Sequence, residues 1–350
     1  ICYWDRDATQ FKWQDGTDGQ ENLYAPFYYR RQTHSVYAQI NERMGPVAFD
    51  AGLRADRLQD DMDLPTITSR HKKYTDLFPS AHVGYYSEVG TFALGYSRRT
   101  NRPGIWKLEP YITYEDYYTR IIGNPDLKSE YIHALDAEWR KNLKKDITLA
   151  VTFFLRRRTG VVDYIRRAYQ PGVTLDSIIN AGDNWEKGFE LQLTSKPVKW
   201  WTTTVNASGY HYNFQASYDG CTNSKGLSGQ IGWINTFAVA KHTGMQFDGH
   251  LVGPNQLTQG RESAYCYFDL AVRQTFLNNK ISMGLVAHDV FHTAKYHSRR
   301  HTQYLLSETW VRPKYPSVTL SLSYHFKQKN QKGHQNSALS SDAEFTGKDF

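Results

Sequence analysis

Four histidines near the C-terminus, His288, His292, His297 and His301, are of a residue type that binds metal ions. Two histidines four positions apart on a helix can bind one zinc ion. In a strand, however, four residues span about 13 Å, which is too far for two ligands of the same ion. We therefore predict no metal site here, and we predict no cofactor.

Catalytic motifs are also missing from the sequence. It contains no nucleophile elbow, phosphate-binding loop or dinucleotide fingerprint. Serines, acidic residues and 13 histidines occur along the chain, but their presence alone does not predict a catalytic set. We predict no catalytic residues and no enzymatic activity.

The segment from 100 to 127 combines aromatic rings with acidic side chains. Rings stack on sugar faces or on aromatic chelates, and carboxylates accept hydrogen bonds from hydroxyl groups. The segment is therefore a candidate ligand-binding loop, and the alternative is that it packs as a structural cap. Its rings are Trp106, Tyr111, Tyr114, Tyr117 and Tyr118, with Glu109, Glu115 and Asp116 close by.

Alternating strands are the elements that would position these side chains. Val318, Leu320 and Leu322 alternate with Thr319 and Ser321, which predicts a strand with one apolar and one polar face. The segments 147–155 and 267–273 show the same alternation. The composition agrees, since the chain is 15% aromatic with a mean hydropathy of −0.64, and no stretch approaches the roughly 20 apolar residues of a spanning helix.

Connection lengths alternate along the chain in the same regular way. Outer-membrane barrels have short periplasmic turns and long external loops, whereas loops of both lengths occur at both ends of a soluble sandwich. Short turns are predicted near 42–45, 87–90, 141–145, 196–199, 241–244 and 277–280, and longer connections near 61–73, 100–127, 168–180, 215–224, 253–260 and 298–304. This alternation favours a transmembrane barrel.

The predicted fold is therefore all-β, a transmembrane antiparallel β-barrel of which this chain holds a part. We count about thirteen strands, the first starting near residue 25, whereas closed bacterial barrels have an even number. Residues 1–326 are predicted to form the C-terminal part of the barrel, with no plug domain in this chain. Residues 327–350 are polar and are predicted to be a disordered periplasmic tail.

Five stretches resemble the C-terminal barrel region of TonB-dependent receptors, in particular the outer-membrane β-barrel family common in the Bacteroidetes. Four of them are GYSRRTNRPGIWKLEPY at 95–111, GNPDLKSEYIHALDAEW at 123–139, INAGDNWEKGFELQLTSKP at 179–197 and VTLSLSYHF at 318–326. The fifth, HDVFHTAKY at 288–296, is similar to the family's Asp-hydrophobe-Phe-Asn-Thr stretch, with His292 in place of Asn.

This resemblance implies a barrel of about 22 strands filled by an N-terminal plug and energised by the TonB complex, which would contact a region outside this sequence. The implied function is uptake of a nutrient, such as a chelated metal, a glycan fragment or a peptide. The implied location is integral in the bacterial outer membrane. A plug-less porin or adhesin-like barrel is the alternative, and a barrel hydrolase, which would need a Ser or Asp near a rim histidine, is a weaker one.

The predicted topology also suggests partners for two sets of residues. Tyr324 and Phe326 form an aromatic-x-aromatic ending that resembles the signal read by barrel-assembly machinery, although such rings also occur at membrane interfaces. The arginines predicted at the external side would face the phosphates of lipopolysaccharide or form a solvated rim. They are Arg98, Arg99, Arg102, Arg156, Arg157, Arg158, Arg299 and Arg300. A surface lipoprotein is a further candidate partner.

Two remaining features predict no additional function. The net charge of +7 is distributed among 35 acidic residues without any recognition motif, so nucleic-acid binding is not predicted. The three cysteines, Cys2, Cys221 and Cys266, fit neither a metal motif nor a disulfide framework.

Overall fold

The computed structural model describes residues 2–5, 8–9, 27–63, 69–144, 146–302 and 305–325. The predicted tail at 327–350 and Phe326 lie outside these described residues. Among the described residues, no helix is long and apolar enough to span a membrane.

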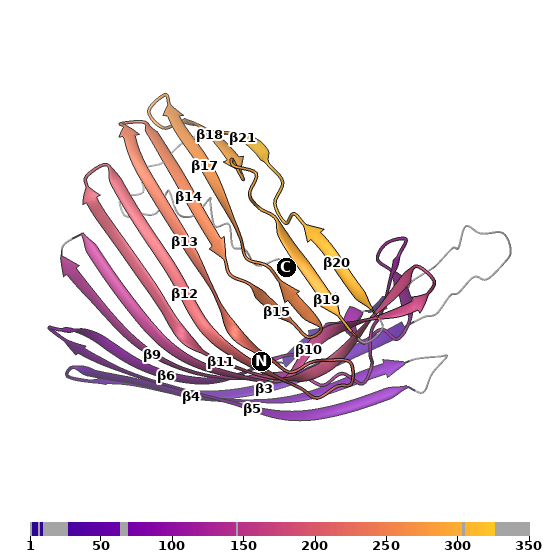
Figure 1. Ribbon diagram of the computed structural model, residues 1–350. Coiled ribbons are helices and arrows are strands. Elements are labelled where there is room, and N and C mark those ends of the chain that lie inside the picture. The colour runs from indigo at the N-terminus through magenta and orange to yellow at the C-terminus, as the bar shows by residue number, and fades with distance from the viewer. Residues whose placement is uncertain are drawn as a thin grey trace.

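Long antiparallel strands form a single curved wall in the order of the chain (Figure 1). Thirteen of the described strands make up this wall, the number that the sequence predicts. They are β3 (Phe27–Met44), β4 (Val47–Asp63), β5 (Arg70–Ser87), β6 (Gly90–Asn101), β9 (Glu130–Lys144), β10 (Ile147–Gln170), β11 (Val173–Val198), β12 (Trp201–Ala216), β13 (Ser224–Ala240), β14 (Thr243–Val252), β17 (Tyr265–Phe276), β18 (Ile281–His288) and β21 (Ser317–Tyr324).

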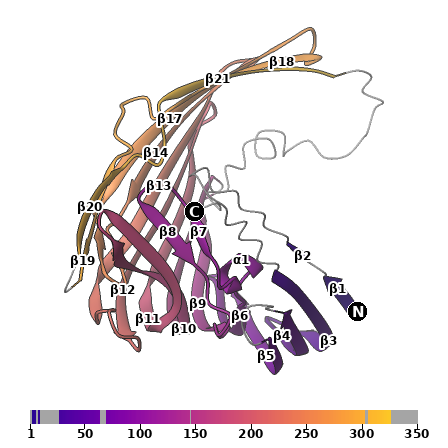
Figure 2. The ribbon, with the colours of Figure 1, turned by 90° about the vertical axis from the view of Figure 1, so that its right-hand side faces the viewer.

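Further short elements lie in the connections of the wall. One helix and six strands are described there: α1 (Ile105–Leu108), β7 (Ile112–Tyr114), β8 (Thr119–Ile122), β15 (Asn255–Leu257), β16 (Gly260–Glu262), β19 (Tyr296–His301) and β20 (Leu306–Val311). The last four form a separate four-stranded sheet. Figure 2 shows the wall as an open curved sheet with α1, β7 and β8 on its concave side.

The edges of the wall are the part that the sequence predicted least well. β1 (Cys2–Asp5) and β2 (Ala8–Thr9) pair antiparallel with β3, so the sheet continues beyond the strand expected to be first. At the other edge β21 pairs with β18. Among the described residues no pairing joins β21 to β3, so the sheet is not closed into a barrel.

The predicted alternation of connection lengths is confirmed with two corrections. The predicted loop at 298–304 is part of a longer connection, 289–316, in which 296–301 form β19 and 306–311 form β20. At one end, here called the short-turn end, six pairs of wall strands are joined through two to four residues, for example Gly45 and Pro46 between β3 and β4. At the opposite, long-loop end, the predicted loop at 168–180 is wrong. β10 and β11 stay paired along their whole length, from Ile147 opposite Ser195 to Gln170 opposite Val173. The chain turns between them at Pro171 and Gly172, and Gly172 has a φ of 76°.

Side chains alternate between two faces of the wall, as the sequence predicted. On β10, Phe153 points to the outer face and is 64% exposed, whereas Phe154 points to the concave inner face and is 6% exposed. Val318, Leu320 and Leu322 of β21 share the outer face and are highly exposed. A wall that presents its apolar side chains outward suits a lipid environment, because exposure of large apolar patches to water is unfavourable.

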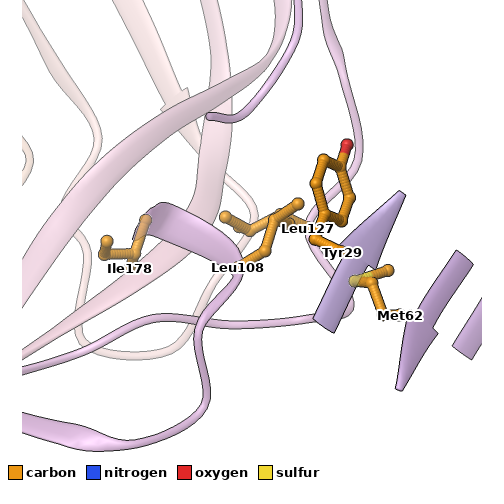
Figure 3. Packing of buried hydrophobic residues seen from close by; sticks show 5 residues of the cluster. All are labelled: Tyr29, Met62, Leu108, Leu127 and Ile178. Carbon is orange, nitrogen blue, oxygen red and sulfur yellow. The ribbon is translucent and has the colours of Figure 1, made fainter. Parts of the chain in front are cut away.

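Apolar side chains from the long connections pack against the inner face near the long-loop end. One cluster joins Leu108 of α1 and Leu127 with Tyr29 of β3, Met62 of β4 and Ile178 of β11 (Figure 3). The connection from 102 to 129 is therefore folded into the concave side of the wall.

Candidate ligand pocket and outer rim

A pocket of about 590 Å³ opens on the inner face beneath the four-stranded sheet. One side consists of inner-face residues of β10 to β13, and the other side consists of residues from the connection at 253–263 and from the segment around β19 and β20. Its lining includes Phe154, Arg156, Arg158, Glu186, Glu190, Tyr210, Gln230, Asn255, Glu262, Tyr265 and Tyr296. A volume of this order can bind a small organic ligand.

Paired charges form one wall of this pocket. Arg156 of β10 donates a 2.9 Å hydrogen bond to Glu190 of β11, and the side chains of Arg158 and Glu186 approach to 3.8 Å. The Arg156 guanidinium also lies 4.1 Å from the centre of the Phe154 ring. With Glu262 the lining holds two arginines and three glutamates, so the pocket has no excess of positive charge.

Tyrosines line both sides of the pocket. The rings of Tyr265 and Tyr296 stack with centroids 5.3 Å apart, and Tyr210 lies 6.4 Å from Phe154. Burial raises the pKa of the Tyr296 phenol, so this group stays protonated and can donate a hydrogen bond. Asn255 donates to Glu262 at 3.0 Å, which places an amide and a carboxylate at the edge of the pocket.

The connection at 253–263 forms the roof of the pocket. The turn between β15 and β16 fastens this roof to the wall. Gln259, which is 4% exposed, accepts a 2.7 Å hydrogen bond from the backbone N–H of Arg166. Its amide donates to the carbonyls of Arg166 and Gly220 at 3.4 and 3.2 Å. The adjacent Thr258 hydroxyl donates to the Tyr164 carbonyl at 3.1 Å. These hydrogen bonds hold the connection at 253–263, the connection between β12 and β13, and the outer part of β10 together.

Replacing Gln259 with alanine is expected to release this roof. The backbone groups of Arg166 and Gly220 lose a buried partner, which costs about 1–3 kcal/mol. Limited proteolysis should then cut the segment 253–263 faster than in the parent protein. The exposed Gln192→Ala on β11 is the control and should leave the cleavage rate unchanged. Equal rates for the Gln259 variant and the parent would contradict this role.

The five aromatic residues predicted as one ligand site are not brought together. Tyr111 packs against the apolar cluster of Figure 3, and Trp106 stacks with Tyr164 of β10 at 6.4 Å. Tyr114 lies under the Arg120 guanidinium. Tyr117 and Tyr118 form an exposed edge-to-face pair at 4.9 Å, between β7 and β8.

The acidic residue of this connection that lies deepest is Glu109, which is 6% exposed. Burial raises the pKa of its carboxyl group. Together with Tyr111 in the apolar cluster, this burial agrees with the alternative reading, in which part of the segment packs as a cap. Tyr117 and Tyr118 at its tip are the most exposed of the five aromatic residues, at 80% and 64%.

The histidine-rich stretch around 288–301 has a structural arrangement that the sequence did not reveal. Asp289 is fully buried, and its carboxylate accepts hydrogen bonds from the backbone N–H groups of Thr293 at 2.8 Å and Ala294 at 3.2 Å. Asp289 and His292 have positive φ angles of 47° and 58°. Asn and His are among the residues that tolerate this conformation, which explains how His292 takes the place of the family's Asn.

Asp269 of β17 links this turn to the inner face. It accepts hydrogen bonds from His288 at 3.2 Å, from the backbone of Asp289 at 2.9 Å and from the Lys314 ammonium. A charged inner-face residue is therefore paired across three segments. Among the described residues, no group of three or more His, Cys, Asp or Glu side chains is arranged to hold a metal ion.

The predicted external arginines divide between the two faces. Arg98 and Arg157 lie on the outer face, and both are cross-strand neighbours of His133. Arg99, Arg156 and Arg158 alternate with them and face inward. Arg102 binds Asp56 and Asp76 at 3.3 and 3.1 Å. Arg299 pairs with Glu308 at 3.4 Å, and Arg300 lies beside it on β19.

The remaining predicted residues are placed only in part. Tyr324 ends β21 on the outer face and is 50% exposed, whereas its partner Phe326 lies outside the described residues, so the assembly signal stays a prediction. Cys221 and Cys266 are free thiols. Burial raises the pKa of the Cys221 thiol to about 11, which keeps it protonated.

Comparison with protein families assigns this architecture. The model described as "Outer membrane protein beta-barrel family" matches residues 3–324. The chain belongs to this family. It is therefore an integral protein of the outer membrane, as the sequence resemblance implied, and its long-loop end corresponds to the external side because barrels of this kind have their short turns in the periplasm. The comparison with curated proteins gave no match.

Solved structures share the fold of this outer-membrane protein at low sequence identity. They include the ferric-catecholate import receptor Fiu from K12 E. coli, with 14% identity, a TM-score of 0.62, and coverage of 88% of this chain and 46% of that chain. The copper transporter OprC has 12% identity and a TM-score of 0.59, with coverage of 84% and 47%. The FrpB iron transporter from Neisseria meningitidis (F5-1 variant) has 14% identity and a TM-score of 0.58, with coverage of 85% and 46%. The chain spans less than half the length of each.

Proposed function

We propose that this chain forms the barrel wall of a TonB-dependent outer-membrane receptor that takes up a nutrient, without covalent chemistry. The family and the fold support an outer-membrane transporter or receptor, and the similar structures are described as transporters or import receptors of iron or copper compounds. The observation that carries the proposal for this chain is the inner-face pocket at its external end, roofed by connections that Gln259 fastens to the wall.

The lining of the pocket favours one kind of ligand. Arg156 is hydrogen-bonded to Glu190, Arg158 lies 3.8 Å from Glu186, and the glutamates of the lining outnumber its arginines. An anionic metal chelate would require unpaired cationic groups, whereas rings combined with amide and carboxylate groups suit a neutral, hydroxyl- or amide-rich molecule. Of the three nutrient classes that the sequence left open, we therefore propose a glycan fragment or a peptide.

Uptake by cells that carry the full-length protein tests this function. Labelled oligosaccharides, short peptides and ferric chelates are offered to cells with and without the TonB complex. We expect accumulation of an oligosaccharide or a peptide only when the complex is present. Equal accumulation in both strains would contradict energised uptake and favour a passive porin. Accumulation of ferric chelates alone would contradict the proposed ligand class.

The pocket itself is tested by paired tyrosine substitutions. Tyr210→Ala and Tyr296→Ala each remove a ring from the pocket. A tyrosine at a binding site contributes about 2 kcal/mol, so we expect each variant to bind the ligand roughly thirtyfold more weakly. Tyr117→Ala and Tyr118→Ala at the exposed tip between β7 and β8 are the matched controls. Loss of binding in the tip variants, with the pocket variants unaffected, would move the ligand site to the loop predicted from the sequence.

A further inference from the structure

A row of basic and polar side chains crosses the outer face of the wall near its external end. It consists of one residue from each of six neighbouring strands, and each is the cross-strand partner of the next. The members of this basic row are Arg98 of β6, His133 of β9, Arg157 of β10, Trp185 of β11, Asn213 of β12 and Lys225 of β13. No member is acidic.

The rows on the periplasmic side of the basic row become apolar within two steps. The first, Tyr96, Leu135, Leu155, Lys187, His211 and Leu227, contains a further lysine. The second contains Leu94, Ala137, Phe153 and Phe189, and Leu94 and Phe153 are 52% and 64% exposed. The basic row therefore lies at the upper boundary of the apolar band that contacts lipid.

The contacts of the row with neighbouring residues leave its cationic groups at the surface. The Tyr96 hydroxyl and His133 Nδ1 are 2.9 Å apart, and the Arg98 guanidinium lies 4.6 Å from the Tyr131 ring. Arg157 lies 5.3 Å from the Trp185 ring, and Asp183 approaches its guanidinium to 3.7 Å. Arg98, Arg157, Lys225 and nearby Lys187 outnumber this carboxylate, so the surface keeps a positive charge.

Strand spacing sets the distance between the two arginines. Neighbouring strands are about 4.8 Å apart, so Arg98 and Arg157, which flank His133 on either side, are separated by about 10 Å at the backbone. Arg98 gives one N–H to the Leu77 carbonyl at 2.6 Å, and its remaining N–H groups together with the Arg157 guanidinium can bind one phosphate through charge-assisted hydrogen bonds. A phosphate held there would lie directly above the exposed Leu94, Phe153 and Leu155.

We propose that the basic row binds the phosphate groups of the outer-leaflet glycolipid, lipopolysaccharide, whose acyl chains then cover the apolar rows beneath it. The combination of the two surfaces favours a lipid headgroup over free phosphate, because a free ion would leave the adjoining apolar side chains without a partner. Of the arginines predicted from the sequence, the structure retains Arg98 and Arg157 for this role. It adds His133 and Lys225, and it excludes the inward-facing Arg99, Arg156 and Arg158.

Binding of lipid A to the full-length protein in detergent micelles tests this inference. The variant R98Q/R157Q/K225Q removes three charges from the basic row. The control R99Q/K196Q/K241Q removes the same charge from the inner face and from the short-turn end. We expect the first variant to bind bisphosphorylated lipid A about ten- to hundredfold more weakly and the control to bind like the parent. Equal binding by both variants would overturn the proposal.

Two further probes distinguish the sources of the binding. Lipid A without phosphates should bind the parent protein weakly. Its affinity should match that of bisphosphorylated lipid A for the row variant R98Q/R157Q/K225Q. If it binds as tightly as bisphosphorylated lipid A, acyl-chain contact accounts for the binding and the phosphate site is wrong. Inorganic phosphate at the same concentration should not compete, and efficient competition would identify a free-anion site instead. An unchanged free energy of unfolding for the row variant shows that its loss of binding is not caused by misfolding.

Discussion

Replacing Arg102 with methionine is expected to lower the free energy of unfolding by about 3–5 kcal/mol, the usual cost of removing one partner from a buried ion pair. Arg102 joins two strands, because its guanidinium binds Asp56 of β4 at 3.3 Å and Asp76 of β5 at 3.1 Å. These carboxylates are 1% and 5% exposed. Asp56 keeps the Arg54 guanidinium at 2.7 Å. Asp76 keeps only the Tyr131 hydroxyl at 2.7 Å as a hydrogen-bond donor and loses its guanidinium partner.

Denaturant unfolding in detergent micelles measures this effect. Arg99→Met is the matched control, because Arg99 lies three positions earlier on the same segment and is exposed. Exposed substitutions away from such contacts change stability by about 0.5 kcal/mol or less. If the Arg102 and Arg99 variants unfold at the same denaturant concentration, the contact between Arg102 and the two carboxylates does not stabilise the wall.

Replacing Asp289 with alanine is expected to destabilise the turn after β18 by about 2–4 kcal/mol, because one buried and one half-buried backbone N–H group lose their acceptor. These groups belong to Thr293 and Ala294. Asp289 also donates its own backbone N–H to Asp269. Alanine keeps this backbone donor, but a turn that moves would shift it, and the contact of His288 and Lys314 with Asp269 on the inner face should then be disturbed.

The variant Asp289→Asn separates the hydrogen bonds from the negative charge. Its side-chain oxygen can still accept from the Thr293 N–H, and asparagine tolerates a positive φ, so it should recover most of the stability lost in Asp289→Ala. Unfolding in denaturant is again the measurement. An Asn variant as unstable as the Ala variant would show that the negative charge of Asp289 stabilises the turn more than its two hydrogen bonds do.

Several features of the site follow from local sequence. The alternation in 147–155 correctly predicted that Phe153 and Phe154 lie on opposite faces of β10, because side chains of a strand alternate with a period of two. The same rule, applied to Arg156, Arg157 and Arg158, would have separated them, but the sequence interpretation treated these arginines as one external group. The error came from grouping residues by position along the chain without assigning each to a face.

Other features depend on residues that are far apart in the sequence. Arg156 meets Glu190 at a separation of 34 residues, and Gln259 meets Arg166 at a separation of 93. Neither pair has a local signal, because their contact depends on the register of β10 with β11 and on the path of the connection at 253–263. The aromatic segment at 100–127 similarly gave no sign that Tyr111 packs inside while Tyr117 stays exposed.

The sequence by itself determined the fold class, the strands of the wall, their two faces and the end at which most loops are long, because these follow from alternation and turn residues within short segments. Only the tertiary structure decided which outward arginines line up beside His133, which charges pair in the pocket and how Gln259 holds the roof. The physical reason is that register and loop packing depend on hydrogen bonds and contacts between distant segments, whereas strand periodicity is a property of each segment alone.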